Sequence, residues 1–138
     1  NPFDAVLSCF MQPFIPNDAM SNFLNLKDTV HFYDLVMKLW CIYQKKLKLN
    51  IHVIKYENVV NNFDATVKNL LNFLQLQWSE DLRNFYLTVD KGRFINTPSY
   101  NQVNRPIYKE SINRWKNYED KFSGLENILN RWVQYFEY

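Results

Sequence analysis

Only one short segment of this 138-residue chain has the pattern of a β-strand, and this limits the folds open to it. In residues 51–56, I-H-V-I-K-Y, β-branched residues alternate with His52 and Lys55, which predicts a strand. A strand without a neighbour is marginally stable at best. We therefore expect either pairing with a second copy or an incomplete α/β domain whose other strands lie outside this sequence.

Apolar residues at helical spacing dominate most of the remaining sequence. Asp4 is expected to cap a first helix, which Pro13 and Pro16 end. Further helices are expected at about 26–48, from Asn62 or Asp64 through Leu74, at 78–87 and at 123–138. The helix at 26–48 is apolar on two sides, so we expect it to be buried over most of its circumference. Its narrow polar stripe consists of His31, Asp34, Lys38 and Lys45.

Composition indicates a folded chain of one domain, 1–138, and excludes several classes of protein. Hydrophobic residues make up 47% of the sequence, which argues against disorder, and the net charge of +2 is too small to indicate nucleic acid as a partner. No segment approaches the roughly 18–20 apolar residues of a membrane span. The two cysteines lack the spacing of metal ligands, so we expect reduced thiols, no metal and a cytoplasmic location.

The segment 97–118, T-P-S-Y-N-Q-V-N-R-P-I-Y-K-E-S-I-N-R-W-K-N-Y, combines hydroxyl groups with cationic residues, among them Arg105, Arg114 and Lys116. The prolines prevent its first half from being a helix interior, whereas residues 109–118 can form a helix. A loop rich in hydroxyl groups that leads into a cationic helix could bind a phosphorylated ligand. An ordinary surface loop with solvated charges would have the same composition, so both interpretations remain open.

Taken together, several segments resemble sulfotransferases that use 3′-phosphoadenosine-5′-phosphosulfate (PAPS), in particular a bacterial branch related to protein-tyrosine sulfotransferases. N-P-F-D-A-V-L-S (1–8) resembles the 3′-phosphate motif of that family without its leading Arg. I-H-V-I-K-Y-E-N-V-V (51–60) resembles the strand end of the family, and N-F-L-Q-L-Q-W (72–78) its usual sequel. Residues 97–118 resemble the Q-V, P-I-Y and R-W pattern of the bacterial branch.

This resemblance implies an α/β, P-loop-NTP-hydrolase-like sulfotransferase fold, present as a mostly helical C-terminal fragment with about one strand. It implies that Ser8 hydrogen-bonds the 3′-phosphate from the start of its helix and that Arg114 contacts the same phosphate. Tyr56 would contact the adenosine, although a tyrosine at this position could equally belong to the core. Thr97 and Ser99 would meet the nucleotide.

The resemblance also implies what this sequence lacks. In the family, the loop that holds the 5′-phosphosulfate and the general base precede the 3′-phosphate motif. The two glycines, Gly92 and Gly124, do not form such a loop, and no residue is assigned a catalytic role. The full protein would transfer a sulfonate to a hydroxyl or amine acceptor, while 1–138 would be inactive and prone to self-association through uncovered surface. The alternative is a non-catalytic helical module that binds other proteins.

Overall fold

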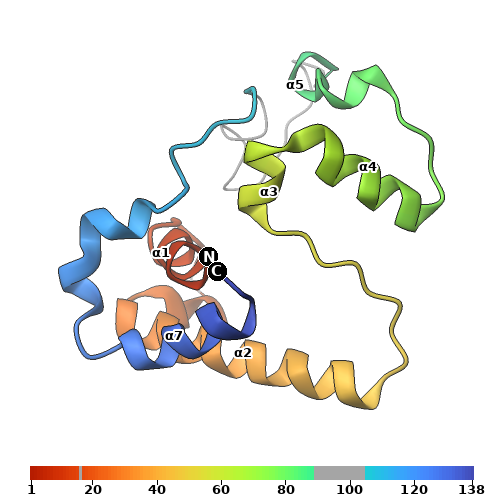
Figure 1. Cartoon of the computed structure of the whole chain (residues 1–138). Helices are drawn as coiled ribbons and strands as arrows, with labels where there is room; N and C mark the ends of the chain where they lie inside the picture. The colour runs from red at the N-terminus through yellow and green to blue at the C-terminus, as the bar shows by residue number, and fades with distance from the viewer. Residues whose placement is uncertain (16, 89–104) are drawn as a thin grey trace. The chain divides into compact units, whose positions relative to one another are not determined.

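The computed structural model describes residues 1–15, 17–88 and 105–138, which fall into two compact units (Figure 1). Unit 1 consists of Asn1–Ile51 and Glu110–Tyr138, and unit 2 consists of His52–Lys109. Unit 1 therefore joins two stretches that lie far apart in the sequence.

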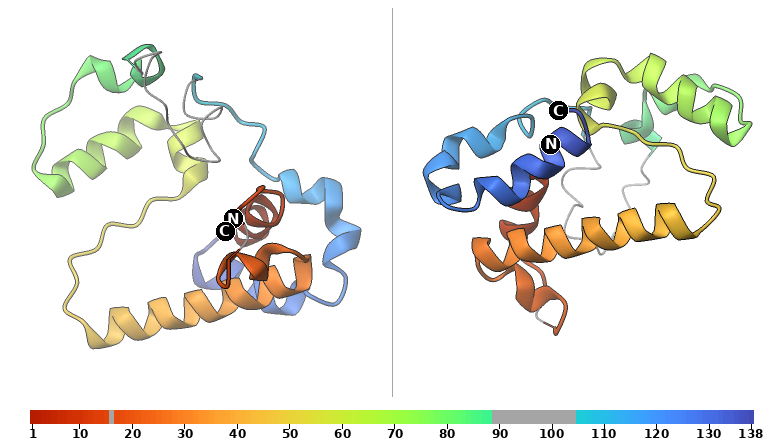
Figure 2. Two further views of the ribbon diagram at one scale, coloured as in Figure 1. Left: turned by 180° about the vertical axis from the view of Figure 1, so that it is seen from behind. Right: turned by 60° about the horizontal axis from the view of Figure 1, so that its bottom comes forward.

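Unit 1 is built from helices alone within its described residues. Its elements are α1 (Pro2–Phe10), the 3-10 helix η1 (Met20–Phe23), α2 (Leu26–Lys46), the 3-10 helix η3 (Arg114–Phe122) and α7 (Glu126–Tyr135). Helix α1 packs against α2, α7 and η3, and α2 also packs against α7. Figure 2 shows α7 beside the N-terminal half of the long helix α2.

Helix α1 begins three residues earlier than expected, and Asp4 does not cap it. The side-chain oxygen of Asn1 accepts a hydrogen bond of 3.0 Å from the backbone N–H of Phe3, so Asn1 is the cap. Pro2 follows as the first helical residue, where its missing N–H costs nothing and its fixed φ angle suits the helix. The cap and Pro2 start the helix, which leaves Asp4 in the first turn with its carboxylate available for another contact.

The hydrophobic core of unit 1 joins all four of its longer elements. Helix α1 buries one face at helical spacing, and that face meets buried side chains of α2, η3 and α7. The core residues are Phe3, Val6, Leu7, Val30, Phe122 and Leu129. Burial of each of these side chains stabilises the fold by about 1.5–3 kcal/mol, so this small core accounts for much of the stability of unit 1.

A buried carboxylate joins α2 to α7. Asp34 is only 7% exposed and accepts a hydrogen bond of 2.8 Å from the indole N–H of Trp132 and another from the guanidinium of Arg131. Lys38, one turn further along α2, lies 2.7 Å from its other oxygen. Burial by itself would raise the pKa of Asp34, but the hydrogen bonds from Lys38, Trp132 and Arg131 lower it below 3.8. Asp34 therefore belongs to the packed interface and not to a solvated polar stripe.

The prediction that α2 is buried over most of its circumference is wrong for the described structure. Leu35, Leu39 and Ile42 are 62%, 45% and 53% exposed, and their spacing places them on one face of the helix. The buried residues of α2, namely Thr29, Val30 and Asp34, all lie in its first half. None of the other described elements of unit 1 covers this apolar face, which explains the difference.

Unit 2 contains α3 (Tyr56–Asn61), α4 (Phe63–Leu74), the 3-10 helix η2 (Glu80–Leu82) and the short helix α5 (Phe85–Thr88). Of its described residues only Leu71 is buried. Arg83 pairs with both Asp64 and Glu80 and lies over the ring of Trp78, so polar and cation–π contacts connect α4 with η2.

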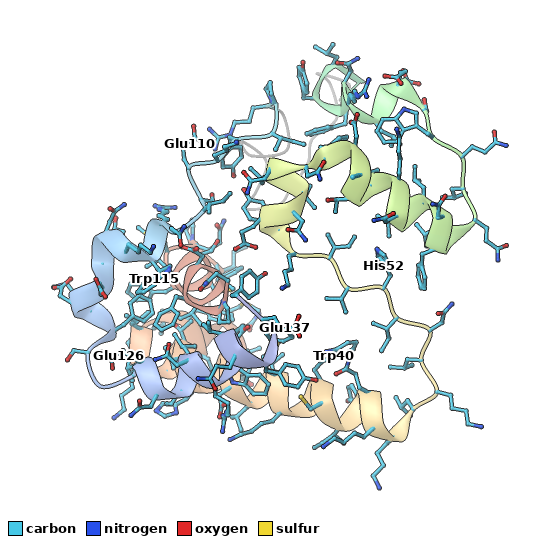
Figure 3. All side chains as sticks on the ribbon, viewed as in Figure 1. Trp40, His52, Glu110, Trp115, Glu126 and Glu137 are labelled. Atoms are coloured by element: carbon cyan, nitrogen blue, oxygen red, sulfur yellow. The ribbon has the colours of Figure 1, made fainter. Side chains whose placement is uncertain are left out.

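The predicted strand at 51–56 is not formed. Residues 51–55 have no regular secondary structure, and Tyr56 is the first residue of α3 (Figure 3 labels the nearby His52). The dihedral angles of Lys55 are extended, as the β-branched sequence predicts, but none of the described residues offers a strand to pair with. The local sequence preference for extended angles is therefore met at Lys55, but the hydrogen bonds to a second strand are absent among the described residues.

The helices near the C-terminus are shorter than the sequence pattern predicts. Helix α7 occupies Glu126–Tyr135 within the expected range 123–138. Gly124 before it has a φ of +80° and Glu137 after it has a φ of +57°, and both values break helical geometry. Upstream, residues 109–113 are not helical, and η3 begins only at Arg114 because Asn113 has a left-handed φ of +58°.

Replacing Asp34 with alanine is expected to lower the free energy of unfolding by about 2 kcal/mol, because the buried N–H of Trp132 loses its acceptor. Urea denaturation followed by tryptophan fluorescence would measure this loss. The folded-state pKa of Asp34 is lowered, so its stabilisation is complete above 3.8 and fades as the pH falls below that value. The difference between wild type and Asp34→Ala should therefore shrink in acid.

The matched control is Asp120→Ala, which removes an exposed carboxylate that pairs with its neighbour Lys121. It should leave the denaturation curve unchanged. A loss for Asp34→Ala no larger than that of the control would contradict the role assigned to the buried carboxylate.

Candidate functional site

The residues expected to bind the nucleotide fall into three groups in the structure. Ser8 on α1 and Arg114 at the start of η3 are both in unit 1 and both exposed. Tyr56 is in unit 2. Thr97 and Ser99 lie outside the described residues. The structure therefore brings Ser8 and Arg114 into the same compact unit, and only this pair can be compared directly.

Asp4 joins α1 to the segment that carries Arg114. One oxygen of its carboxylate accepts a hydrogen bond of 2.9 Å from the backbone N–H of Trp115, and the other accepts one of 2.8 Å from the backbone N–H of Asn113. Arg114 is the residue between these two donors. Hydrogen bonds from backbone N–H groups to a carboxylate are stronger than those between neutral groups, so this contact fixes the backbone on both sides of Arg114.

Aromatic packing supports the same junction from the core side. The rings of Phe3 and Trp115 are stacked with centroids 4.3 Å apart, and both rings meet Phe122 edge to face at 5.3 and 6.2 Å. Figure 3 labels Trp115 beside α1. Phe3 and Asp4 are adjacent in sequence, so the first turn of α1 holds the R-W segment by an apolar contact and a polar contact at once.

Asp4 and Ser8 are one helical turn apart and therefore lie on the same face of α1. Since the Asp4 carboxylate bonds the backbone of residues 113 and 115, Ser8 lies on the face of α1 that meets this segment. The expectation that Ser8 is at the start of its helix is wrong. Because the helix already begins at Pro2, Ser8 is two residues before its last residue, and its hydroxyl gains nothing from the positive end of the helix dipole.

The charges near this pair are mixed, since the Asp4 carboxylate bonds the backbone on both sides of Arg114. Among the described residues, no carboxylate forms an ion pair with Arg114 or with Lys116, two positions further along η3. An exposed hydroxyl group together with a guanidinium that has no counterion is suited to binding a phosphate group, to which arginine can donate two parallel hydrogen bonds.

Tyr56 is 43% exposed, and its hydroxyl donates a hydrogen bond of 3.4 Å to the backbone carbonyl of Tyr108. Within unit 2, this contact joins the start of α3 to the middle of the 97–118 segment. Arg105 lies 3.4 Å from the centroid of the Tyr108 ring, a close cation–π contact. Tyr56 is thus exposed at a helix start and is not a core residue of a strand.

Cys9, next to Ser8, is a reduced thiol without nucleophilic character. Burial raises the pKa of its thiol, so the protonated form predominates at neutral pH. Burial, followed in importance by the proximity of Cys9, raises the pKa of Tyr33 to about 12. The groups next to Ser8 therefore offer neither a thiolate nor a phenolate to the site.

Neither a metal site nor a membrane-spanning helix is found among the described residues. No group of three or more His, Cys, Asp or Glu side chains is placed to hold a metal ion. No described helix combines the length and apolar character needed to cross a membrane.

The contact between Asp4 and residues 113–115 was not predicted from the sequence. An acidic residue in a first turn is typical of helix ends, and the spacing was interpreted as a cap. The N-P-x-D-x-x-x-S pattern does hold Asp4 and Ser8 one turn apart, which is the signal for a shared face. Nothing in the sequence indicates that the partner of Asp4 lies 109 and 111 positions further along the chain.

Comparison with known proteins identifies the family. The model of the "Sulfotransferase family" matches residues 1–80, which is more than half of the 138 residues. The chain belongs to the sulfotransferase family. The match extends from α1 through α4 and ends before residues 97–118, so the resemblance of that segment to one bacterial branch stays a prediction.

A relative among curated proteins matches nearly the whole chain. It is an uncharacterized protein from Aquifex aeolicus (strain VF5), 25% identical over 133 residues. These residues make up 94% of this chain but only 17% of the relative, so the chain spans a small part of that protein's length. No solved structure matches the chain.

We expect the backbone N–H groups of Asn113 and Trp115 to exchange with solvent more slowly than those of neighbouring exposed residues, because both donate to Asp4. In Asp4→Ala this protection should be lost while exchange in α2 stays unchanged. Hydrogen exchange followed by nuclear magnetic resonance would measure both. Equal exchange rates for the two amides in wild type and variant would show that Asp4 does not hold this segment in solution.

Proposed function

We propose that this chain forms part of the donor-nucleotide site of a PAPS-dependent sulfotransferase, within a domain of the α/β, P-loop-like fold. The full protein would transfer a sulfonate from PAPS to a hydroxyl or amine acceptor. Family membership supports the reaction type. The observation that supports the assignment to a phosphate site is the contact of Asp4 with residues 113 and 115, because it joins the backbone around Arg114 to the helix that carries Ser8.

In such a transfer the acceptor atom bonds to sulfur, the bond from sulfur to the bridging oxygen of PAPS breaks, and the acceptor loses a proton. The bisphosphate that leaves must be held during this exchange. We assign the hydroxyl of Ser8 and the guanidinium of Arg114 to its 3′-phosphate. Tyr56 is assigned to the adenosine, and Thr97 and Ser99 to the nucleotide; these three roles stay predictions.

No residue of this sequence is proposed as the general base or as the loop that holds the 5′-phosphosulfate. Those parts are expected from sequence that precedes the N-P-x-D motif in the family. In this proposal 1–138 is the C-terminal portion of one incomplete domain. The exposed face formed by Leu35, Leu39 and Ile42 is the surface through which self-association is predicted.

Adenosine 3′,5′-bisphosphate should bind to 1–138, and Arg114→Ala should weaken this binding by about 1.5–3 kcal/mol through loss of a charge-assisted phosphate contact. Isothermal titration calorimetry would measure both affinities. The matched control is Lys121→Ala, which removes a cation of the same element that is already paired with Asp120. Unchanged affinity in Arg114→Ala, or an equal loss in the control, would favour the alternative of a non-catalytic module that binds other proteins.

Purified 1–138 is expected to transfer no sulfonate from PAPS to a hydroxyl or amine acceptor, because it lacks a glycine-rich phosphate loop and an assigned base. Incubation with radiolabelled PAPS and a panel of alcohol, phenol and amine acceptors would test this. Measurable turnover that Arg114→Ala reduces would mean that the catalytic groups lie within this sequence after all.

A further inference from the structure

Asp4 is the one charged group that directly contacts the backbone on either side of Arg114 among the described residues. Asp4 has neither of the roles considered above: Asn1 caps the helix in its place, and the phosphate is assigned to Ser8 and Arg114. A carboxylate repels a phosphate, so its position beside a proposed phosphate site requires a reason.

The backbone around Arg114 is irregular and depends on contacts with other segments for a fixed conformation. Asn113 is in the left-handed region with a φ of +58°, and η3 is a 3-10 helix with a kink at Tyr118, where φ is −131°. Such segments make poorer hydrogen bonds than an α-helix and so depend on outside contacts for a fixed shape. The two hydrogen bonds to Asp4, together with the stack of Phe3 on Trp115, supply those contacts.

We propose that Asp4 is a positioning residue for the donor nucleotide: it fixes the backbone on both sides of Arg114 so that the guanidinium is held beside Ser8 before the 3′-phosphate arrives. This inference rests on the proposed function and extends it to a residue that does not touch the ligand. Ordering the arginine in advance removes part of the entropic cost of binding, which is the general benefit of preorganisation.

The direction in which the affinity for the bisphosphate changes when Asp4 loses its charge separates this positioning role from a simple charge effect. If Asp4 acted only through its charge, removing that charge would strengthen the binding of an anion. If Asp4 positions Arg114, removing the charge must weaken binding in spite of the more favourable electrostatics. Asp4→Asn is the suitable change because it keeps the shape of the side chain but replaces one acceptor oxygen with a donor.

The test compares two nucleotides on the chain 1–138. Asp4→Asn should bind adenosine 3′,5′-bisphosphate about tenfold more weakly, as expected for the loss of roughly one charge-assisted contact. It should bind adenosine 5′-monophosphate, which lacks the 3′-phosphate, as wild type does. In the double variant Asp4→Asn/Arg114→Ala the loss should equal that of Arg114→Ala alone, because both changes remove the same interaction.

Two further variants make the outcome decisive. Asp120→Asn removes an equal charge from η3 without touching Asp4 and should leave the affinity for the bisphosphate unchanged or slightly higher. Asp4→Glu keeps the charge but moves the oxygens, so it should also lose preference for the bisphosphate. If Asp4→Asn does not fold, as judged by circular dichroism, the preference of Asp4→Glu for the bisphosphate over the monophosphate takes its place as the test.

The inference is overturned if Asp4→Asn, or in its place Asp4→Glu, retains the full preference for the bisphosphate. It is also overturned if both nucleotides lose affinity equally, since that pattern indicates general damage to the fold. If wild type shows no preference for the bisphosphate over the monophosphate, the proposed function itself fails and the inference falls with it. Loss in Arg114→Ala without loss in Asp4→Asn would remove only the role of Asp4.

Discussion

The carboxylate of Asp4 connects two parts of the sequence whose side chains are proposed to act together. Its hydrogen bonds to the backbone of residues 113 and 115, with the Phe3–Trp115 stack beside them, make one unit from segments separated by more than a hundred positions. Without this junction, Ser8 and Arg114 would be an isolated serine on a helix and an isolated arginine on a 3-10 turn. In the proposed site, the position of Arg114 relative to Ser8 depends on Asp4.

A second carboxylate has a comparable structural role deeper in the same unit. Asp34 joins α2 to α7 through Trp132 and Arg131, and so sets the framework on which α1 and η3 pack. Beyond Asp34, the apolar face of α2 is exposed in the described structure. The same helix thus carries buried core residues in its first half, and in the rest of its length one apolar face is exposed while Gln44 still bonds Tyr135 of α7.

Sequence patterns located most helices correctly because helical spacing of apolar residues reflects local geometry. The helices expected at 26–48 and up to Leu74 are confirmed as α2 and α4 within a few residues. The strand at 51–56 was predicted from the same kind of local evidence and is wrong. A strand, unlike a helix, takes its hydrogen bonds from another segment, and none of the described residues provides one.

The sequence by itself determined the family and the positions of the main helices, and it suggested the residues of the proposed phosphate site, since these depend on motifs and on spacing along the chain. Tertiary structure alone decided that Asp4 binds a distant backbone and that Asp34 is buried. The reason is physical: a carboxylate in a first turn has the same local pattern whether it caps its own helix or bonds to another segment. Only the packing of the distant segment against α1 determines which of these two contacts forms.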